Sequence, residues 1–289
     1  MSDFVTFAHS HGVLIDHAKL FASQRIRRCP TTENPRTLNG AYFWDGERGW
    51  VWAWDGEARV QWWNDPHARP WTEAEKEQFR RQRDAAKSAK QRSYAEAAQR
   101  AQALLDSARP AFHDYLHLKG FPALPGAVLD DGALAVPMRN VVTNRLQGLQ
   151  LIRWEADALK WVKKMTHGMQ ARNAVFRMGP PKAQESILCE GYATGLSLEA
   201  AARQLRLHAA VVVCFSAGNI KPVAAQIQGR KYVYADNDKS GAGERAAIDA
   251  GLPYCMSDTV GFDANDDHQK HGLMAVCKKL MDLRRRRDL

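Results

Sequence analysis

Carboxylates follow two apolar segments in the second half of the chain. Glu190 follows the run 186–189, and Asp236 and Asp238 come directly after the run 231–235. In an extended strand, two residues that are two positions apart point the same way, with Cα atoms roughly 7 Å from each other. Crowded carboxylates raise one another's pKa unless a divalent cation neutralises them, and Mg²⁺ prefers oxygen ligands of this kind. The three residues therefore predict a site for Mg²⁺ (or Mn²⁺).

The segments around these carboxylates alternate between strand-like and helical patterns. Apolar runs at 186–189, 208–215 and 231–235 are separated by helical spacing over 193–205 and 222–228, and a closing helix is predicted over 265–283. This alternation predicts an α/β fold with a parallel sheet and right-handed crossovers. Such a fold brings the carboxylates to one edge of the sheet. The alternative, that each acid is a helix cap or turn residue, explains one of them better than all three.

Three short motifs stand in this region: Glu190-Gly191-Tyr192-Ala193-Thr194-Gly195, Asp236-Asn237-Asp238 and Asp263-Ala264-Asn265-Asp266. Over about residues 185–280 they resemble the Toprim domain, in the version found in phage and plasmid DNA primases. The resemblance implies that Glu190, Asp236 and Asp238 are catalytic and bind metal. It also implies supporting contacts from Gly191, Asp263, Asn265 and Asp266. Topoisomerases, nucleases and recombination proteins share this domain, so the motifs identify the domain better than the reaction.

The segment 109–182 contains strand-like runs and predicts an α+β subdomain. It resembles the region before the Toprim domain in primases, where a basic strand pair lines the channel for template and nucleotide. That resemblance implies nucleic-acid or nucleotide binding by six basic residues. They are Arg139, Arg153, Lys160, Lys163, Lys164 and Arg172. The alternative for any one of them is an ordinary surface charge.

Residues 1–70 hold most of the nine tryptophans and predict a small β-rich domain. Three alternating runs, 40–44, 49–54 and 58–63, are separated by the hairpin signals Asp45-Gly46 and Asp55-Gly56. Arg28-Cys29-Pro30 is similar to the opening of the zinc ribbon of bacterial primases. However, Thr32 stands where that ribbon has His and no Cys-x-x-Cys follows, so we expect no zinc. The tryptophans then either form the core of the sheet or stack on single-stranded bases.

A capping box at 72–75 begins a polar, Ala-rich helical stretch that predicts a charged helical linker over 71–108. The expected domain plan is therefore an aromatic-rich, zinc-free ribbon-like domain at 1–70, the linker, the α+β basic subdomain at 109–182, and a Toprim domain at 183–289. A basic tail at 284–287 ends the chain and is expected to add affinity for polyanions.

The composition favours a polyanionic partner. The 289 residues carry a formal net charge of +9, and the pI is about 9.4. No apolar run reaches the ~20 residues that span a bilayer, so we expect a cytoplasmic protein without a membrane partner. Five scattered cysteines, an odd number, indicate reduced thiols.

With the resemblance, these observations predict a DNA primase. It would join nucleoside triphosphates into short RNA primers on single-stranded DNA by Mg²⁺-dependent nucleotidyl transfer. The alternatives are a Toprim nuclease that cleaves DNA and a non-catalytic replication accessory protein that binds single-stranded DNA. The sequence has no Walker A loop, so a separate replicative helicase is an expected partner.

Overall fold

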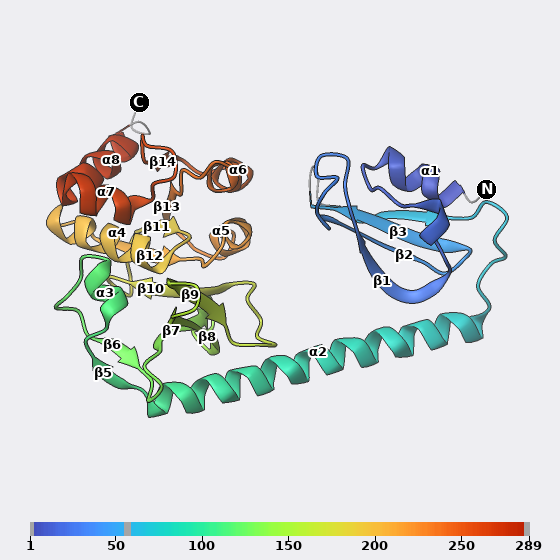
Figure 1. Ribbon diagram of the computed structural model, residues 1–289, viewed down its shortest axis with the longest axis horizontal. Helices are drawn as coiled ribbons and strands as arrows, with labels where there is room; N and C mark the ends of the chain where they lie inside the picture. Colours follow the sequence, from blue (N-terminus) through green and yellow to red (C-terminus); the bar gives the residue numbers. More distant parts are fainter. Residues whose placement is uncertain (1–2, 55–58, 286–289) are drawn as a thin grey trace. The chain divides into compact units, whose positions relative to one another are not determined.

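The computed structural model describes residues 3–54 and 59–285, which divide into two compact units, 1–83 and 84–289. Figure 1 shows the elements of each unit. The predicted turn at Asp55-Gly56 and the last residues of the basic tail lie outside the described residues. The linker predicted at 71–108 is one helix, α2 (Glu73–Ser107), and the boundary between the units falls within it.

The N-terminal unit is built on an antiparallel sheet with the strand order β1-β2-β3-β4. Its elements are α1 (Asp3–Ser10), η1 (His17–Lys19), β1 (Ser23–Cys29), β2 (Gly40–Trp44), β3 (Arg48–Ala53) and β4 (Gln61–Asn64). The predicted meander is present as β2, β3 and β4. The sequence analysis missed β1, which pairs Cys29 with Gly40, because its polar and arginine-rich sequence lacks an apolar alternation.

The two faces of this sheet have different roles. On one face Phe4 of α1 stacks on Trp44 with ring centroids 5.9 Å apart and meets the edge of Trp63 at 5.4 Å. These rings form the core with Tyr42 and Val51. The opposite face carries the remaining sheet tryptophans: Trp50 and Trp52 are half-buried, Trp54 and Trp62 are exposed, and Trp50 pairs with Trp62 across β3 and β4. Only part of the tryptophan set therefore packs in the core.

Cys29 lies inside this aromatic core. It is only 4% exposed, and burial raises the pKa of its thiol to about 11. The neutral thiol is the favoured form at physiological pH, whereas a metal ligand must be a thiolate. Ring packing therefore accounts for the stability of this small sheet without a metal.

We predict that the fold of the N-terminal unit does not depend on zinc. Trp63→Ala should lower the free energy of unfolding by about 3–5 kcal/mol because it leaves a cavity beside Phe4. EDTA should leave the thermal midpoint of the full chain unchanged, and Cys29→Ala should cost far less than Trp63→Ala. A midpoint lowered by EDTA, or about one zinc per chain by elemental analysis, would contradict this prediction.

The C-terminal unit contains a long mixed sheet with the order β14-β13-β11-β12-β10-β7-β6-β5, and β8 and β9 branch from β7. Its strands are β5 (Arg109–Ala111), β6 (Gly126–Val128), β7 (Leu134–Asn140), β8 (Leu146–Glu155), β9 (Lys160–Met165), β10 (Ala174–Met178), β11 (Glu185–Cys189), β12 (Ala209–Val213), β13 (Arg230–Ala235) and β14 (Tyr254–Met256). Its remaining helices are α3 (Asp114–Leu118), α4 (Tyr192–Gln204), α5 (Ala217–Ala224), α6 (Ala242–Asp249), α7 (Ala264–His271) and α8 (Leu273–Arg285).

The predicted α/β parallel sheet is confirmed: β11 pairs in parallel with β12 and β13, and β13 with β14. Helices α4, α7 and α8 cover one face of these strands, and α5 and α6 cover the other (Figure 1). Alternate strand residues serve the two cores: Ile187 and Cys189 belong to the first, and Leu188 belongs to the second. Burial on both faces explains the continuous apolar runs in the sequence.

Two helix predictions differ from the structure. The helix expected over 222–228 is α5 (Ala217–Ala224), which begins directly after the turn at Ser216. The single closing helix expected over 265–283 is instead α7 and α8, separated at Gly272. Gly272 has a φ of 81°, a left-handed conformation that glycine adopts without strain and that ends a helix.

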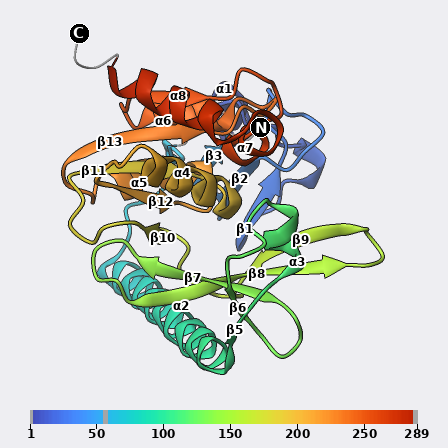
Figure 2. The ribbon, with the colours of Figure 1, turned by 90° about the vertical axis from the view of Figure 1, so that its left-hand side faces the viewer.

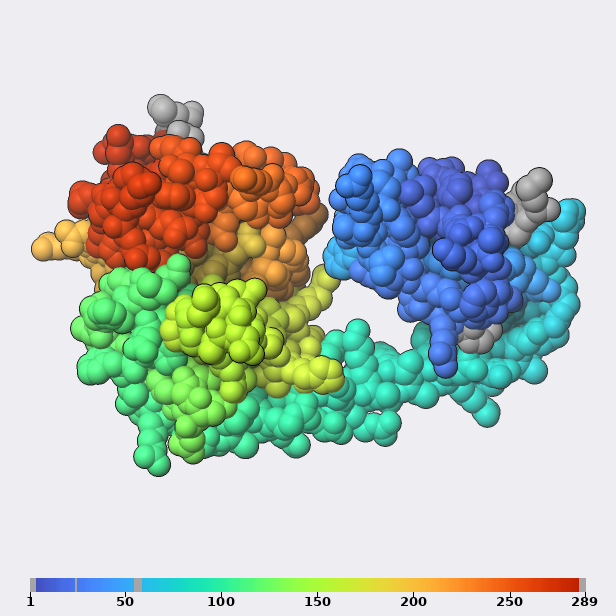
Figure 3. All heavy atoms as spheres, viewed as in Figure 1, coloured from blue at the N-terminus to red at the C-terminus, as the bar shows by residue number. Residues whose placement is uncertain are grey.

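The antiparallel strands of the unit form a layer beside the parallel strands, as Figure 2 shows. Ala101 of α2 packs with Leu129, Ala133, Ala135 and Leu149 in the core beneath β7 and β8. In the space-filling view the β8–β9 hairpin, coloured yellow-green, stands out at the surface of the unit (Figure 3). Among the helices of the described ranges, none combines the length and apolarity that a membrane crossing requires.

Candidate functional site

The carboxylates Glu190 and Asp236 leave neighbouring parallel strands at the same edge. Leu188 of β11 is in register with Val233 of β13. Glu190 is the residue directly after β11, and Asp236 is the residue directly after β13. This is the edge where open α/β sheets place ligands. The parallel register alone therefore brings two residues that are far apart in sequence to one place.

Glu190 is held by the turn that precedes α5. The backbone N–H of Ala217 donates a hydrogen bond to its carboxylate, and Phe215 N–H donates to its backbone carbonyl at 2.9 Å. Phe215 has a φ of 64°, which is unusual for a residue with a bulky side chain. Burial raises the pKa of Glu190, and the charge of Asp238 raises it further, whereas the Ala217 hydrogen bond opposes both. Backbone strain at this turn thus coincides with the positioning of a carboxylate.

Asp236 is the most strongly perturbed acid of the group. Burial is the largest cause that raises its pKa to about 7, together with the charges of Glu190, Asp263 and Asp238. Lys163 opposes them. Asp236 is therefore poised between its charged and neutral forms near neutral pH.

Asp238 differs from its neighbours because it is exposed. It accepts a hydrogen bond from the Ser240 hydroxyl at 2.7 Å and a longer one from Ala242 N–H at 3.4 Å. The Ser240 bond is the main cause that lowers the pKa of Asp238. Asp238 thus organises the turn before α6, as the alternative of a turn residue predicts, while its charge still acts on Glu190 and Asp236.

The fit of a divalent cation rests on two buried oxygens. Oε1 of Glu190 and Oδ1 of Asp236 are buried and, within the described part of the chain, have no hydrogen-bond partner. A buried carboxylate oxygen without a partner is costly, and a cation would relieve that cost. Among all the residues that the structure describes, there is no group of three His, Cys, Asp or Glu side chains already placed to hold a metal ion. The two unpartnered oxygens are donors of the kind that Mg²⁺ prefers, and Glu190 and Asp236 would hold it, with Asp238 beside them.

Gly243 in the first turn of α6 allows a close approach to both carboxylate residues. A Cβ atom at this position would lie 2.7 Å from the carbonyl oxygen of Asp236 and 3.0 Å from Oε1 of Glu190. The absence of a side chain therefore lets α6 pack directly on the end of β13. It also leaves room beside the Glu190 oxygen.

The four supporting residues lie at the N-termini of two helices, Gly191 before α4 and the other three at the start of α7. Asp263 caps α7, shares a capping box with Asp266, and accepts a hydrogen bond from the Thr194 hydroxyl at 2.9 Å. Asn265 is fully buried and donates to the Lys119 carbonyl at 2.8 Å. Gly191 precedes α4, and a Cβ there would lie 2.8 Å from the Thr194 hydroxyl. Of the four, Asp263 acts directly on the electrostatics of Asp236.

The structure places the six basic candidates differently. Lys163 is near the carboxylates, since its charge lowers the pKa of Asp236, and its ammonium lies 5.6 Å from the centre of the Tyr115 ring. Strand alternation puts Lys160 and Lys164 on the other face of β9. Two of the candidates form ion pairs: Lys164 with Glu155 at 2.8 Å and Arg153 with Asp131 at 2.6 Å. Arg139 donates a hydrogen bond to the Asn144 carbonyl at 3.3 Å. Arg172 is exposed.

Some residues of the site have no separate signal in the sequence. Tyr115 of α3 is 1% exposed, burial raises its pKa to about 12, and the charges of Lys119 and Asp263 act on it. It comes from a segment about 75 positions before Glu190, so only tertiary contact reveals it. Ala217 acts through its backbone N–H, which no side-chain pattern shows. Gly243 could be suspected from its position just after the Asp236–Asp238 turn.

We predict that Asp236 makes the stability of the metal-free chain fall as pH rises. The native state keeps a proton with a pKa of about 7, whereas the unfolded state releases it near 3.8. Between these pH values the native state binds more protons, so the free energy of unfolding decreases by a few kcal/mol as pH increases. Asp236→Asn should remove this part of the dependence in urea unfolding at pH 5 and pH 8.

Mg²⁺ should stabilise the parent at pH 8 more than it stabilises Asp236→Asn, because binding to the native state alone raises stability. Asp249→Asn, at the exposed end of α6, is the matched control and should behave as the parent. Identical pH profiles for the parent and Asp236→Asn would contradict the assignment.

Comparison with protein families agrees with this geometry. Residues 185–273 match a family model described as Toprim domain. A search of curated proteins gave no match. The matched residues begin at β11 and include Glu190, Asp236, Asp238 and the α7 cap. The predicted resemblance is thus confirmed at the level of the domain: residues 185–273 form a Toprim domain, a type that primases, topoisomerases and nucleases share.

Proposed function

We propose that this chain is a DNA primase that joins ribonucleotides into short primers on single-stranded DNA. The observation that carries the proposal is the pair of buried, unpartnered carboxylate oxygens of Glu190 and Asp236 within a Toprim domain. A Toprim domain is typical of Mg²⁺-dependent phosphoryl transfer. The basic β8–β9 hairpin, with Lys163 acting on Asp236, supports the choice of a polyanionic substrate.

Mg²⁺, when bound, would supply Lewis-acid stabilisation of the transferring phosphate. Asp236 and Glu190 would hold it, and Asp238 would complete the negative surface that attracts it. The raised pKa of Glu190 also suits a group that accepts the proton of the attacking 3′-hydroxyl. Lys163 would contact the triphosphate as a point charge. The other basic candidates, with Arg139 and Lys160 foremost, would bind the template backbone.

The proposed partners follow from the same chemistry. They are a single-stranded DNA template, nucleoside triphosphates and a separate replicative helicase that exposes the template. A nuclease would need the same carboxylates, so the products of the reaction decide between the two activities.

Asp236→Asn should abolish primer synthesis while leaving DNA affinity nearly unchanged, because it removes an anionic ligand and keeps the shape. The rate should fall by at least two orders of magnitude, since each ~1.4 kcal/mol of lost transition-state stabilisation is a factor of ten. Labelled products formed from single-stranded DNA, the four NTPs and Mg²⁺ would be sized on a gel, with filter binding on the same preparations. Asp249→Asn is the control.

Primer synthesis at the parental rate by Asp236→Asn would refute the metal-site assignment. Shortened template in place of new primers would favour the nuclease alternative. DNA binding by the parent without primers or cleavage would favour the accessory protein.

The basic candidates predict a salt-dependent affinity for single-stranded DNA. Each phosphate neutralised should contribute roughly −0.7 to the log-log slope of affinity against salt. Lys160→Ala and Arg139→Ala should each flatten the slope by about that amount. Lys164→Ala, whose ammonium is already paired with Glu155, should flatten it less. A slope near zero, or one that these variants leave unchanged, would rule out this surface as the template channel.

A further inference from the structure

The N-terminal unit contains a cavity of about 800 Å³ that the Toprim chemistry does not use. It is lined by the face of the sheet opposite the Phe4 core, by the segment 65–71 and by the first turns of α2. Four aromatic side chains line it: Phe43, Trp62, Trp71 and Phe79. Trp62 is 68% exposed and Phe79 is 48% exposed, so their rings are open to a ligand.

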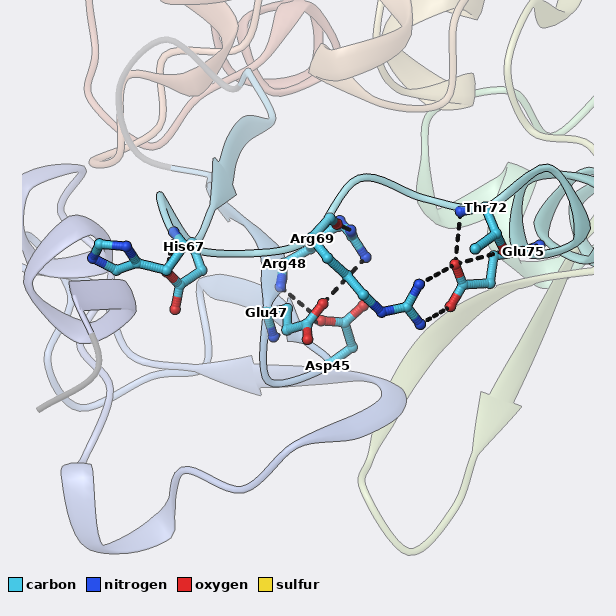
Figure 4. Close-up of polar contacts among 8 residues, drawn as sticks. Asp45, Glu47, Arg48, His67, Arg69, Thr72 and Glu75 are labelled. Carbon is cyan, nitrogen blue, oxygen red and sulfur yellow. Dashed lines mark hydrogen bonds and ion pairs between the residues drawn. The ribbon is translucent and has the colours of Figure 1, made fainter.

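The charged groups of this cavity are balanced and already paired. Arg69 forms a two-pronged ion pair with Glu75, which also accepts hydrogen bonds from Thr72 (Figure 4). These contacts lower the pKa of Glu75 to about 2. Asp45 accepts hydrogen bonds from the backbone N–H groups of Glu47 and Arg48.

Arg48, Lys76 and the remaining acid are engaged as well. Lys76 pairs with Glu73 at 2.7 Å. The Arg48 guanidinium lies 4.8 Å from the centre of the Trp71 ring and donates to the Arg69 carbonyl at 2.7 Å. Asp65 accepts from His67 N–H at 2.8 Å. A phosphate group would have to break these contacts, so the cavity suits the uncharged part of a ligand.

The lining combines ring edges and faces with amide side chains. Trp71 and Phe79 meet edge to face with centroids 5.1 Å apart, and Asn64, Gln78 and Gln82 also line the cavity. Flat aromatic surfaces attract a flat ring, while amides can donate and accept hydrogen bonds at its edge. The volume is within the range of ordinary small-molecule sites.

We propose that this cavity binds one unpaired nucleobase, carried either by a free nucleotide or by single-stranded nucleic acid. The base would lie against Trp62 and Phe79, with its polar edge toward the amides and its phosphate outside the cavity. The proposal depends on no residue of the Toprim site and goes beyond the proposed primer synthesis, so the two can fail separately.

The test measures binding by the full chain, without turnover, to a 12-nucleotide dT strand and to an abasic strand of equal length and charge. The dT strand should bind more tightly, because stacking contributes roughly 1–3 kcal/mol per base. Trp62→Ala and Phe79→Ala should each weaken dT binding roughly 5- to 150-fold, because a stacking energy of about 1–3 kcal/mol corresponds to that ratio of dissociation constants. Binding of the abasic strand should remain unchanged. Trp62→Phe, which keeps a ring, should retain most of the affinity.

Trp54→Ala is the matched control, because it removes an exposed tryptophan of the same unit that does not line the cavity. Asp236→Asn should bind the dT strand as the parent does, which separates this test from catalysis. If free thymidine monophosphate displaces the dT strand from the parent but not from Trp62→Ala, a free nucleotide is a source of the base. If it does not displace the strand from the parent, the base comes from the strand.

Equal binding of the dT and abasic strands by the parent would overturn the proposal. So would parental dT affinity in both Trp62→Ala and Phe79→Ala, or an equal loss in Trp54→Ala. The thermal midpoint of each variant, measured on the same samples, shows that a loss of affinity does not come from unfolding.

Discussion

The enclosure of one carboxylate oxygen from each of two neighbouring acids is the constraint on which the C-terminal unit depends. Glu190 and Asp236 sit at the edge of a parallel sheet with oxygens that make no hydrogen bond among the described residues, and burial raises both pKa values. Such an arrangement is unfavourable for the chain alone. It persists because the cores on both faces of the sheet hold β11 and β13 in register. The stability of the sheet thus maintains a site that favours a cation.

The surrounding turns serve the same purpose. Phe215 has a positive φ in the turn from which the Ala217 N–H donates a hydrogen bond to the Glu190 carboxylate. Because Gly243 has no side chain, α6 packs closely against Asp236 and Glu190. Asp263 adds negative charge from a third direction while it caps α7. Lys163 supplies the opposing charge from β9, a strand of the antiparallel layer. The Toprim domain and the strands before it therefore form one electrostatic unit.

The N-terminal unit is a small four-stranded sheet that carries many large aromatic side chains. One face uses Phe4, Trp44 and Trp63 as a core, which gives the sheet an apolar interior. The opposite face carries rings that are only partly covered, among them the exposed Trp54 and Trp62. The charges beside these rings are already paired. The same residue type thus stabilises one face and, in the proposed binding of a base, supplies the stacking surface on the other.

The sequence by itself determined the α/β class, the three carboxylates and the Toprim motifs, because each depends on local order: apolar runs, strand ends and residues two positions apart. It also located the β2–β4 meander through its alternating pattern. Only the tertiary structure decided that Asp236 is half-buried with one enclosed oxygen while Asp238 is exposed, and that Lys163 faces the site while Lys160 does not. The first distinction depends on how the turn after β13 packs, and the second depends on which face of β9 meets the neighbouring elements. The contributions of Tyr115, Ala217 and β1 could not be predicted from the sequence, because they depend on contacts between distant segments or on backbone groups, which the pattern of residue types does not show.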